Sequence, residues 1–199
     1  MPKIVDHEAR RAELAEAMWR VVYRDGAAAA TVRSIATEAG WSPGALRHYF
    51  TTQTELLAFA MEHVITKATR RFYAKDWTGP VREVVQRMLE EFLPLDQQRI
   101  REMEVWLLLA ARSPADPVAR ARVAEADDGV RRATELAVVT LADAGLVAAD
   151  RDLPSETARL HALVDGLALH ALLHPDVMPP DRVRATLGHH LDDLLRPAA

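Results

Sequence analysis

The sequence of 199 residues contains no cysteine. This excludes a disulfide framework, a thiol nucleophile and a thiolate metal site. No apolar run reaches about 18 residues, so no membrane-spanning helix is expected. The first eleven residues are charged and lack the apolar stretch of a secretory signal. Aromatic residues make up only 6% of the chain, but hydrophobic residues make up 49%, which is enough for a sizeable core. Together these features predict a folded cytoplasmic protein.

Charge is unevenly distributed along the chain, whose formal net charge is −4. Residues 1–75 carry 11 basic and 8 acidic residues, a net charge of +3, whereas residues 76–199 carry 14 and 21, a net charge of −7. A more basic N-terminal part indicates a surface that faces nucleic acid. Random scatter of solvated charges is the alternative explanation.

The spacing of apolar residues predicts helices nearly everywhere and no strand. In the first segment, Leu14, Met18 and Val22 lie on one face of a helix that Gly26 ends. Thr31 and Ser42 are good N-terminal caps. Further helices are expected near residues 32–40, 43–49, 54–72, 81–92, 100–113, 117–145, 155–173 and 180–195. The fold class is therefore all-α, with about nine helices.

Residues 31–50 read as a helix-turn-helix, in which the second helix enters the major groove of DNA. Gly40 allows the tight turn, and Ile35 and Leu46 point inward. Two short helices joined by glycine also occur in all-α proteins that do not bind DNA. The residues expected to face DNA are Thr31, Arg33, Ser42, Pro43, Gly44, Ala45, Arg47, His48, Tyr49 and Gln53.

The N-terminal quarter of the chain resembles the DNA-binding domain of TetR-family regulators. The resemblance is carried by Gly26, Thr31-Val32, Ile35-Ala36, Ala39-Gly40, Ser42-Pro43-Gly44, Leu46, His48-Tyr49-Phe50 and Leu56. The later residues resemble the BetI-like branch of the family through Glu104-Val105-Trp106, Asp165-Gly166-Leu167-Ala168-Leu169 and the closing helix. The resemblance implies a DNA-binding domain at 1–52 and a ligand-binding and dimerisation domain at 53–199.

Two residues depart from the usual family pattern. Arg47 replaces a tyrosine that contacts phosphate, and Gln53 replaces a lysine. Arginine supplies a charge in place of the hydroxyl. Gln53 can donate a hydrogen bond to phosphate but releases no counterion, so it adds little salt dependence.

Small residues four apart on the helix expected at 155–173 favour a close crossing with another helix. Packing within the chain is the alternative, and the family resemblance favours a homodimer with an isologous contact. The residues expected at the dimer interface are Ala158, Ala162, Gly166, Leu187 and Leu191.

The middle helices carry aromatic and methionine residues that could line an effector cavity. Each of these residues, taken alone, is more often explained as plain core. The candidate ligand-binding residues are Trp77, Met88, Phe92, Glu102, Met103 and Trp106. For a cationic ligand, Trp106 and Glu102 would provide cation–π and charge contacts.

No catalytic, cofactor or metal site is expected. His170 and His174, and the pair His189-His190, have neither cysteines nor an HExxH pattern to accompany them. The chain also lacks a G-x-S-x-G elbow and a phosphate-binding glycine loop. The expected function is therefore a ligand-responsive repressor that binds a palindromic operator in double-stranded DNA as a homodimer. The alternative is a dimeric helical binder of a small molecule or protein without a DNA-binding function.

Overall fold

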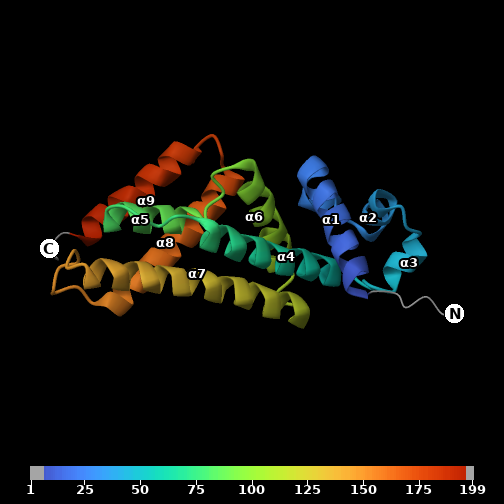
Figure 1. Cartoon of the computed structure of the whole chain (residues 1–199), viewed down its shortest axis with the longest axis horizontal. Coiled ribbons are helices and arrows are strands. Elements are labelled where there is room, and N and C mark those ends of the chain that lie inside the picture. The colour runs from blue at the N-terminus through green and yellow to red at the C-terminus, as the bar shows by residue number, and fades with distance from the viewer. Residues whose placement is uncertain (1–6, 196–199) are drawn as a thin grey trace. The chain divides into compact units, whose positions relative to one another are not determined.

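The computed structural model describes residues 7–195, and in this range it consists of helices and loops without a strand. The described residues form nine α-helices, which Figure 1 labels in chain order. The first four are α1 (His7–Asp25), α2 (Val32–Ala39), α3 (Pro43–Arg47) and α4 (Gln53–Ala74), with a 3₁₀ turn, η1 (Ala27–Ala29), before α2. The others are α5 (Val81–Glu90), α6 (Gln97–Ala110), α7 (Pro117–Asp143), α8 (Leu153–Leu173) and α9 (Pro180–Leu194). The predicted all-α class is confirmed.

The helix ends follow the cap residues closely but not everywhere. α3 ends at Arg47 rather than near Tyr49, and η1 was not expected from the apolar pattern. α8 begins at Leu153, because Asp152 caps it by accepting a hydrogen bond from the Ser155 N–H at 3.2 Å. Ser155 had been expected to start this helix. An aspartate two residues before Pro154 is equally suited to cap a helix that has proline in its first turn.

The described chain forms two compact units. The first contains the described residues up to Lys67 together with Arg101–Ala124, and the second contains Ala68–Ile100 and the described residues from Glu125 onward. α4, α6 and α7 each contribute residues to both units. The sequence suggests a different division, with a DNA-binding domain at 1–52 and a ligand-binding and dimerisation domain at 53–199. This division stays a prediction.

The first unit is built around the inward faces of α1, α2, α3 and the start of α4. α1 packs against α2, and α2 packs against α3. Burial of their apolar side chains supplies the main stabilisation of this unit, at about 25 cal/mol for each Å² of apolar surface removed from water. The largest fully buried side chains are Leu14, Met18, Ile35, Leu46, Leu56 and Leu57.

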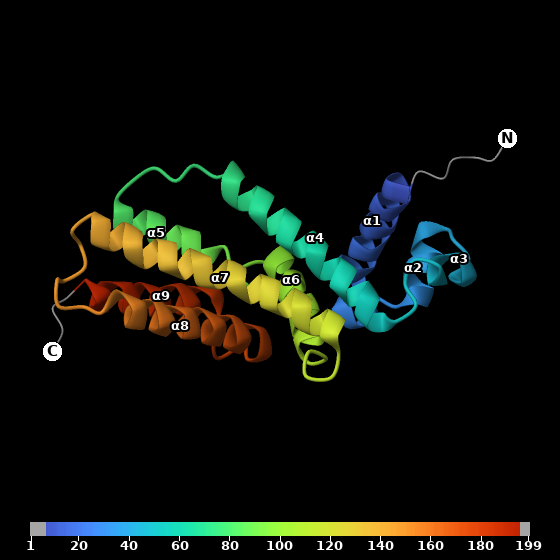
Figure 2. The ribbon, with the colours of Figure 1, turned by 90° about the horizontal axis from the view of Figure 1, so that it is seen from below.

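The second unit is held by α5, α8 and α9. α9 packs against both α8 and α5, and Figure 2 shows α8 and α9 running side by side. Its core is formed by completely or almost completely buried apolar side chains, including Val85, Leu89, Leu141, Leu160, Val164, Leu187 and Leu191. No helix in the part of the chain that the structure describes is long and apolar enough to cross a membrane.

Candidate DNA-binding and effector sites

The turn between α2 and α3 is defined by backbone geometry that only a few residues tolerate. Gly40 has φ +69° and ψ +26°, the left-handed conformation, and its N–H donates to the carbonyls at the end of α2. The N–H of Trp41 donates to the Ala36 carbonyl at 2.8 Å. A residue with a Cβ is disfavoured in this conformation, so Gly40 fixes where α2 stops and how α3 departs.

Both helices of this motif have side-chain caps at their N-termini, as the sequence predicts. Thr31 accepts a hydrogen bond from the Ser34 N–H at 3.1 Å, and the Ser34 hydroxyl accepts one from the Thr31 N–H at 2.9 Å. Ser42 accepts from the Ala45 N–H at 3.1 Å, with Pro43 at the first helical position. These caps stabilise two helices that would be too short to persist alone.

Core residues orient the motif so that its polar side faces outward. Ile35, Ala36 and Leu46 are completely buried, which confirms that Ile35 and Leu46 point inward. The residues exposed on this surface are Thr31, Arg33, Ser42, Pro43, Gly44, Arg47 and His48. A pre-formed α3 with an exposed polar face is the geometry that major-groove recognition requires.

Arg33 and Arg47 carry the positive charge of this surface. Both are exposed, and among the described residues neither guanidinium has a carboxylate within ion-pair distance. Arg20 and Arg24 differ, because both pair with Glu38, at 2.7 and 2.8 Å. Those two hydrogen bonds lower the pKa of Glu38, with the bond from Arg24 the larger cause. The charges of Arg33 and Arg47 are therefore available to an anionic partner.

Two of the expected DNA-facing residues also have structural contacts. Gln53 is half-buried, and its amide Nε2 donates to the Ala30 carbonyl at 2.6 Å. This bond ties α4 to the segment just before α2. Tyr49 is half-buried, with its ring edge-on to Trp41 at 5.5 Å between centroids. Ala45 is half-buried as well.

The expected effector residues do not gather in one unit. Trp77, Met88 and Phe92 belong to the second unit, whereas Glu102, Met103 and Trp106 lie on α6 in the first. Glu102 is buried, and Trp106 is one helical turn further along α6 and half-buried. Met88 is buried on α5, as a core residue would be. Trp77 donates from Nε1 to the Phe72 carbonyl at 3.0 Å and packs on the Phe72 ring.

A cavity of about 350 Å³ lies in the second unit beside Trp77. Its remaining lining is charged and consists of Lys75, Asp76, Arg87, Glu90, Glu91, Arg99 and Arg184. Trp77 is thus the only one of the six candidates that lines this cavity. Effector cavities are mostly apolar with few polar groups, so the charged lining does not match the aromatic cavity that the sequence suggests.

Glu91 holds this charged region together. Its carboxylate pairs with Arg71 at 2.8 Å, with Arg99 at 3.3 Å and with Lys75, while only 5% of its side chain is exposed. Burial acts to raise the pKa of Glu91. The hydrogen bonds from Lys75 and Arg71 and the charge of Arg99 outweigh burial and lower the pKa.

A contact that the sequence did not reveal joins α6 to the turn before the DNA-binding motif. Glu104 accepts a hydrogen bond from the Ala27 N–H at 3.1 Å and pairs with Arg101 at 2.6 Å. A Cβ at Gly26, where φ is +87°, would come within 3.3 Å of the Arg101 guanidinium. Gly26, Arg101 and Glu104 therefore pack closely against one another. No sequence signal indicates this contact, because Glu104 reads as one more polar residue on an amphipathic helix.

The expected interface residues fall into two groups. Ala158 and Ala162 are exposed on α8 and Gly166 is half-exposed, so this face is open to a second copy. Leu187 and Leu191 have no exposed surface. They pack into the core of their own unit, so neither side chain offers exposed surface to a second copy.

Most of the chain matches known proteins. Residues 14–59 match the family described as bacterial regulatory proteins, tetR family, and residues 81–196 match the BetI-type transcriptional repressor C-terminal domain. The chain is 42% identical to the HTH-type transcriptional regulator PksA of Bacillus subtilis, covering 98% of this chain and 94% of that one. It is 31% identical to the regulator BetI of Burkholderia cenocepacia, covering 98% of each.

A solved structure supports the same relationship. A regulator from Saccharomonospora viridis, crystallised in complex with choline, superposes with a TM-score of 0.81 at 26% identity, covering 93% of this chain and 96% of that one. These relatives are regulators of transcription and not enzymes. The chain therefore belongs to the TetR family of bacterial transcriptional regulators, with a DNA-binding helix-turn-helix domain and a BetI-type C-terminal domain.

Proposed function

We propose that the protein is a repressor that binds a palindromic operator as a homodimer in the cytoplasm and changes its DNA affinity when a small cationic effector binds. The observation that carries this proposal is the exposed, capped α2–α3 motif with Arg33 and Arg47 free of carboxylate partners. Arg47 sits in the last turn of α3, where its guanidinium can reach a guanine edge or a phosphate.

A homodimer would place two copies of α3 in successive major grooves. Twofold symmetry requires half-sites about 34 Å apart, or a multiple of that distance. The exposed small residues Ala158 and Ala162 on α8 support a close helix contact between copies. Replacing Ala162 with arginine should turn a dimer into a monomer in analytical ultracentrifugation, and a wild-type chain that is itself monomeric would contradict the homodimer.

A cationic effector is supported by α6. Glu102 is buried and Trp106 lies one turn away on the same helix, so the two side chains can contact one bound cation. The S. viridis neighbour was crystallised with choline, a quaternary ammonium ion. We use choline as the first probe, because a quaternary ammonium cannot donate hydrogen bonds and depends on aromatic and carboxylate contacts.

The route from effector to DNA runs through the contact between Glu104 and Ala27. Glu104 lies on α6 between Glu102 and Trp106, and Ala27 begins the turn that leads to Thr31 and α2. A small displacement of α6 on effector binding would move this turn. α4, which begins beside Ala30 through the Gln53 bond, is the second connection. Coupling of about 1–3 kcal/mol would change DNA affinity about 5- to 150-fold.

The test is DNA binding by fluorescence anisotropy on a duplex selected in vitro from random sequence. We expect selection of a palindrome, an affinity that falls steeply with salt and a choline-dependent change in affinity. Tryptophan fluorescence provides the effector readout, and Trp106→Phe separates Trp106 from Trp19, Trp41 and Trp77. Failure to select any sequence would favour a dimeric helical binder without a DNA-binding function. A DNA-binding protein that ignores cationic effectors would overturn only the effector part.

A further inference from the structure

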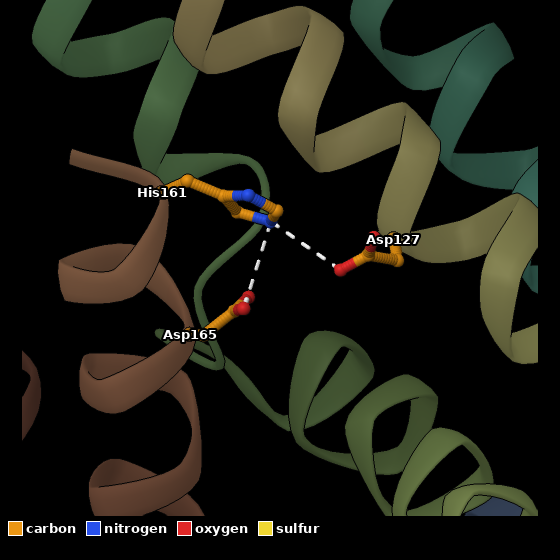
Figure 3. Close-up of side chains that lie close together, drawn as sticks. All are labelled: Asp127, His161 and Asp165. Carbon is orange, nitrogen blue, oxygen red and sulfur yellow. Dashed lines mark ion pairs between the residues drawn. The ribbon is translucent and has the colours of Figure 1, made fainter. Parts of the chain in front are cut away.

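Three side chains that commonly bind metals meet on α7 and α8 within the second unit. They are Asp127 on α7 and His161 and Asp165 on α8. Their candidate ligand atoms all lie within 4.8 Å of one another. Figure 3 shows both carboxylates directed toward the imidazole Nε2 of His161. His161 and Asp165 are one helical turn apart, a spacing that places them on the same face.

The distances suit ligands of one ion better than hydrogen-bonded partners. The His161 Nε2 lies 3.5 Å from Asp127 Oδ1 and 3.5 Å from Asp165 Oδ2. This nitrogen is buried and has no hydrogen-bond partner among the described residues. Two ligand atoms about 2.1 Å from a tetrahedral Zn²⁺ lie about 3.4 Å from each other. The two separations observed match that value closely.

The charges around Asp127, His161 and Asp165 also favour a bound cation. Among the described residues, neither Asp127 nor Asp165 pairs with a lysine or arginine. The arginines nearby on α7, Arg131 and Arg132, pair with Asp128 instead. Among the described residues, no lysine or arginine therefore neutralises these two carboxylates by an ion pair.

We propose that Asp127, His161 and Asp165 bind one divalent transition-metal ion, with Zn²⁺ as the best match. One imidazole nitrogen and two carboxylate oxygens suit Zn²⁺, whereas Ca²⁺ and Mg²⁺ prefer sites made of oxygen alone. Asp127 and Asp165 have 56% and 54% of their side chains exposed, so they can adjust and the ion can enter from solvent. Three protein ligands leave a fourth position for water or for a donor atom of another molecule.

The sequence predicts no metal site, and the histidines that it sets aside for that role are His170 with His174 and the pair His189-His190. His170 and His174 do pack against each other, with ring centroids 5.9 Å apart, but neither belongs to the cluster. The spacing of His161 and Asp165 is visible in the sequence. Asp127 is not visible as their neighbour, because only the packing of α7 beside α8 brings it to them.

The test is isothermal titration calorimetry of the full-length chain, freed of any polyhistidine tag and treated with a chelator, using ZnCl₂. We expect one Zn²⁺ per chain. His161→Gln and Asp127→Asn should each weaken binding at least about tenfold, since even residues that only support metal ligands cost that much. Zn²⁺ should also raise the Tm of the wild type, because it binds the folded chain, and should not raise that of His161→Gln.

Two variants serve as controls. His174→Gln removes the histidine that directly follows α8, and Asp128→Asn removes the neighbouring carboxylate of α7; both should bind Zn²⁺ like the wild type. Asp127→Asn changes a largely exposed side chain, so it tests the site even if His161→Gln folds poorly. Wild-type affinity in His161→Gln or Asp127→Asn would overturn the proposal. So would tighter binding of Ca²⁺ than Zn²⁺, or no Zn²⁺ binding at all.

Discussion

Arginines in two regions of this protein have opposite surroundings. On the α2–α3 surface, Arg33 and Arg47 are exposed and have no carboxylate partner among the described residues. In the second unit, Arg71 and Arg99 both pair with the buried Glu91. An unpaired surface charge contributes little to folding and is available for binding, whereas a buried charge must be paired for the unit to fold. The same residue type is thus available for binding in one region and stabilises the fold in the other.

The largest effect should come from breaking the buried network. Glu91→Ala leaves Arg71, Lys75 and Arg99 close together without their shared carboxylate. We expect the free energy of unfolding to fall by about 3 kcal/mol, the lower end of the range for breaking a buried pair, because Lys75 is partly exposed. Urea denaturation monitored by circular dichroism measures this.

The matched control is Asp128→Ala. Asp128 also pairs with two arginines, Arg131 and Arg132, but 40% of its side chain is exposed, so its removal should lower the free energy of unfolding much less than Glu91→Ala does. The sign of the pH dependence follows from the lowered pKa of Glu91. The network stabilises the wild type above the ordinary glutamate pKa of about 4.3, and this stabilisation is lost as the pH falls through the folded-state value. Glu91→Ala should lose less stability over that range. Equal losses in Glu91→Ala and Asp128→Ala would refute the distinction between buried and exposed pairs.

On the α2–α3 surface, Arg47→Ala should reduce operator affinity without changing the free energy of unfolding. A loss of about 1–3 kcal/mol in binding free energy is expected if Arg47 contacts a base, with relaxed specificity at one position. Anisotropy titrations at several salt concentrations measure both effects. Arg70→Ala, another exposed arginine, is the control and should bind DNA normally. A lower stability of Arg47→Ala than of the wild type would show that Arg47 does not act in DNA binding alone.

Two glycines allow a smaller and sharper comparison. Gly40 has a positive φ and open space where a Cβ would lie, and Gly129 lies within helix α7, also with open space. Gly40→Ala should destabilise the chain by about 1 kcal/mol, because alanine is strained in the left-handed region. Gly129→Ala should stabilise it by about 0.5–1 kcal/mol, because alanine favours the helix. Thermal unfolding gives both values, and changes of the same sign would mean that backbone conformation does not explain them.

The smallest effect is expected at the contact between α6 and the turn before α2. Glu104→Gln keeps an acceptor for the Ala27 N–H but loses the charge that pairs with Arg101. We expect DNA affinity without effector to stay near wild type and the effector-induced change to shrink by less than about 1 kcal/mol. Anisotropy with and without choline measures this. A full effector response in Glu104→Ala, which removes the acceptor entirely, would exclude this contact as the route of coupling.

Local sequence rules described the caps and the turn of the α2–α3 motif well and the rest of the chain less well. The caps at Thr31 and Ser42 and the turn at Gly40 involve residues at most a few positions apart, so cap chemistry identifies them. The prediction of the effector residues rests mainly on the aromatic and methionine residues of the middle helices, and the structure distributes the six residues over two units. Leu187 and Leu191 show the same limit: an apolar stripe does not tell whether it faces the chain's own core or a second copy.

The sequence by itself determined the all-α class, most helix boundaries and the helix-turn-helix motif, because periodicity, caps and positive-φ glycines act within one or two turns of helix. Only the tertiary structure decided which distant polar groups meet. It brought Glu104 to Ala27, Glu91 to three cations, and Asp127 to His161 and Asp165. Such contacts depend on how whole helices pack. The sequence around a polar residue does not indicate which distant residue it will contact after packing.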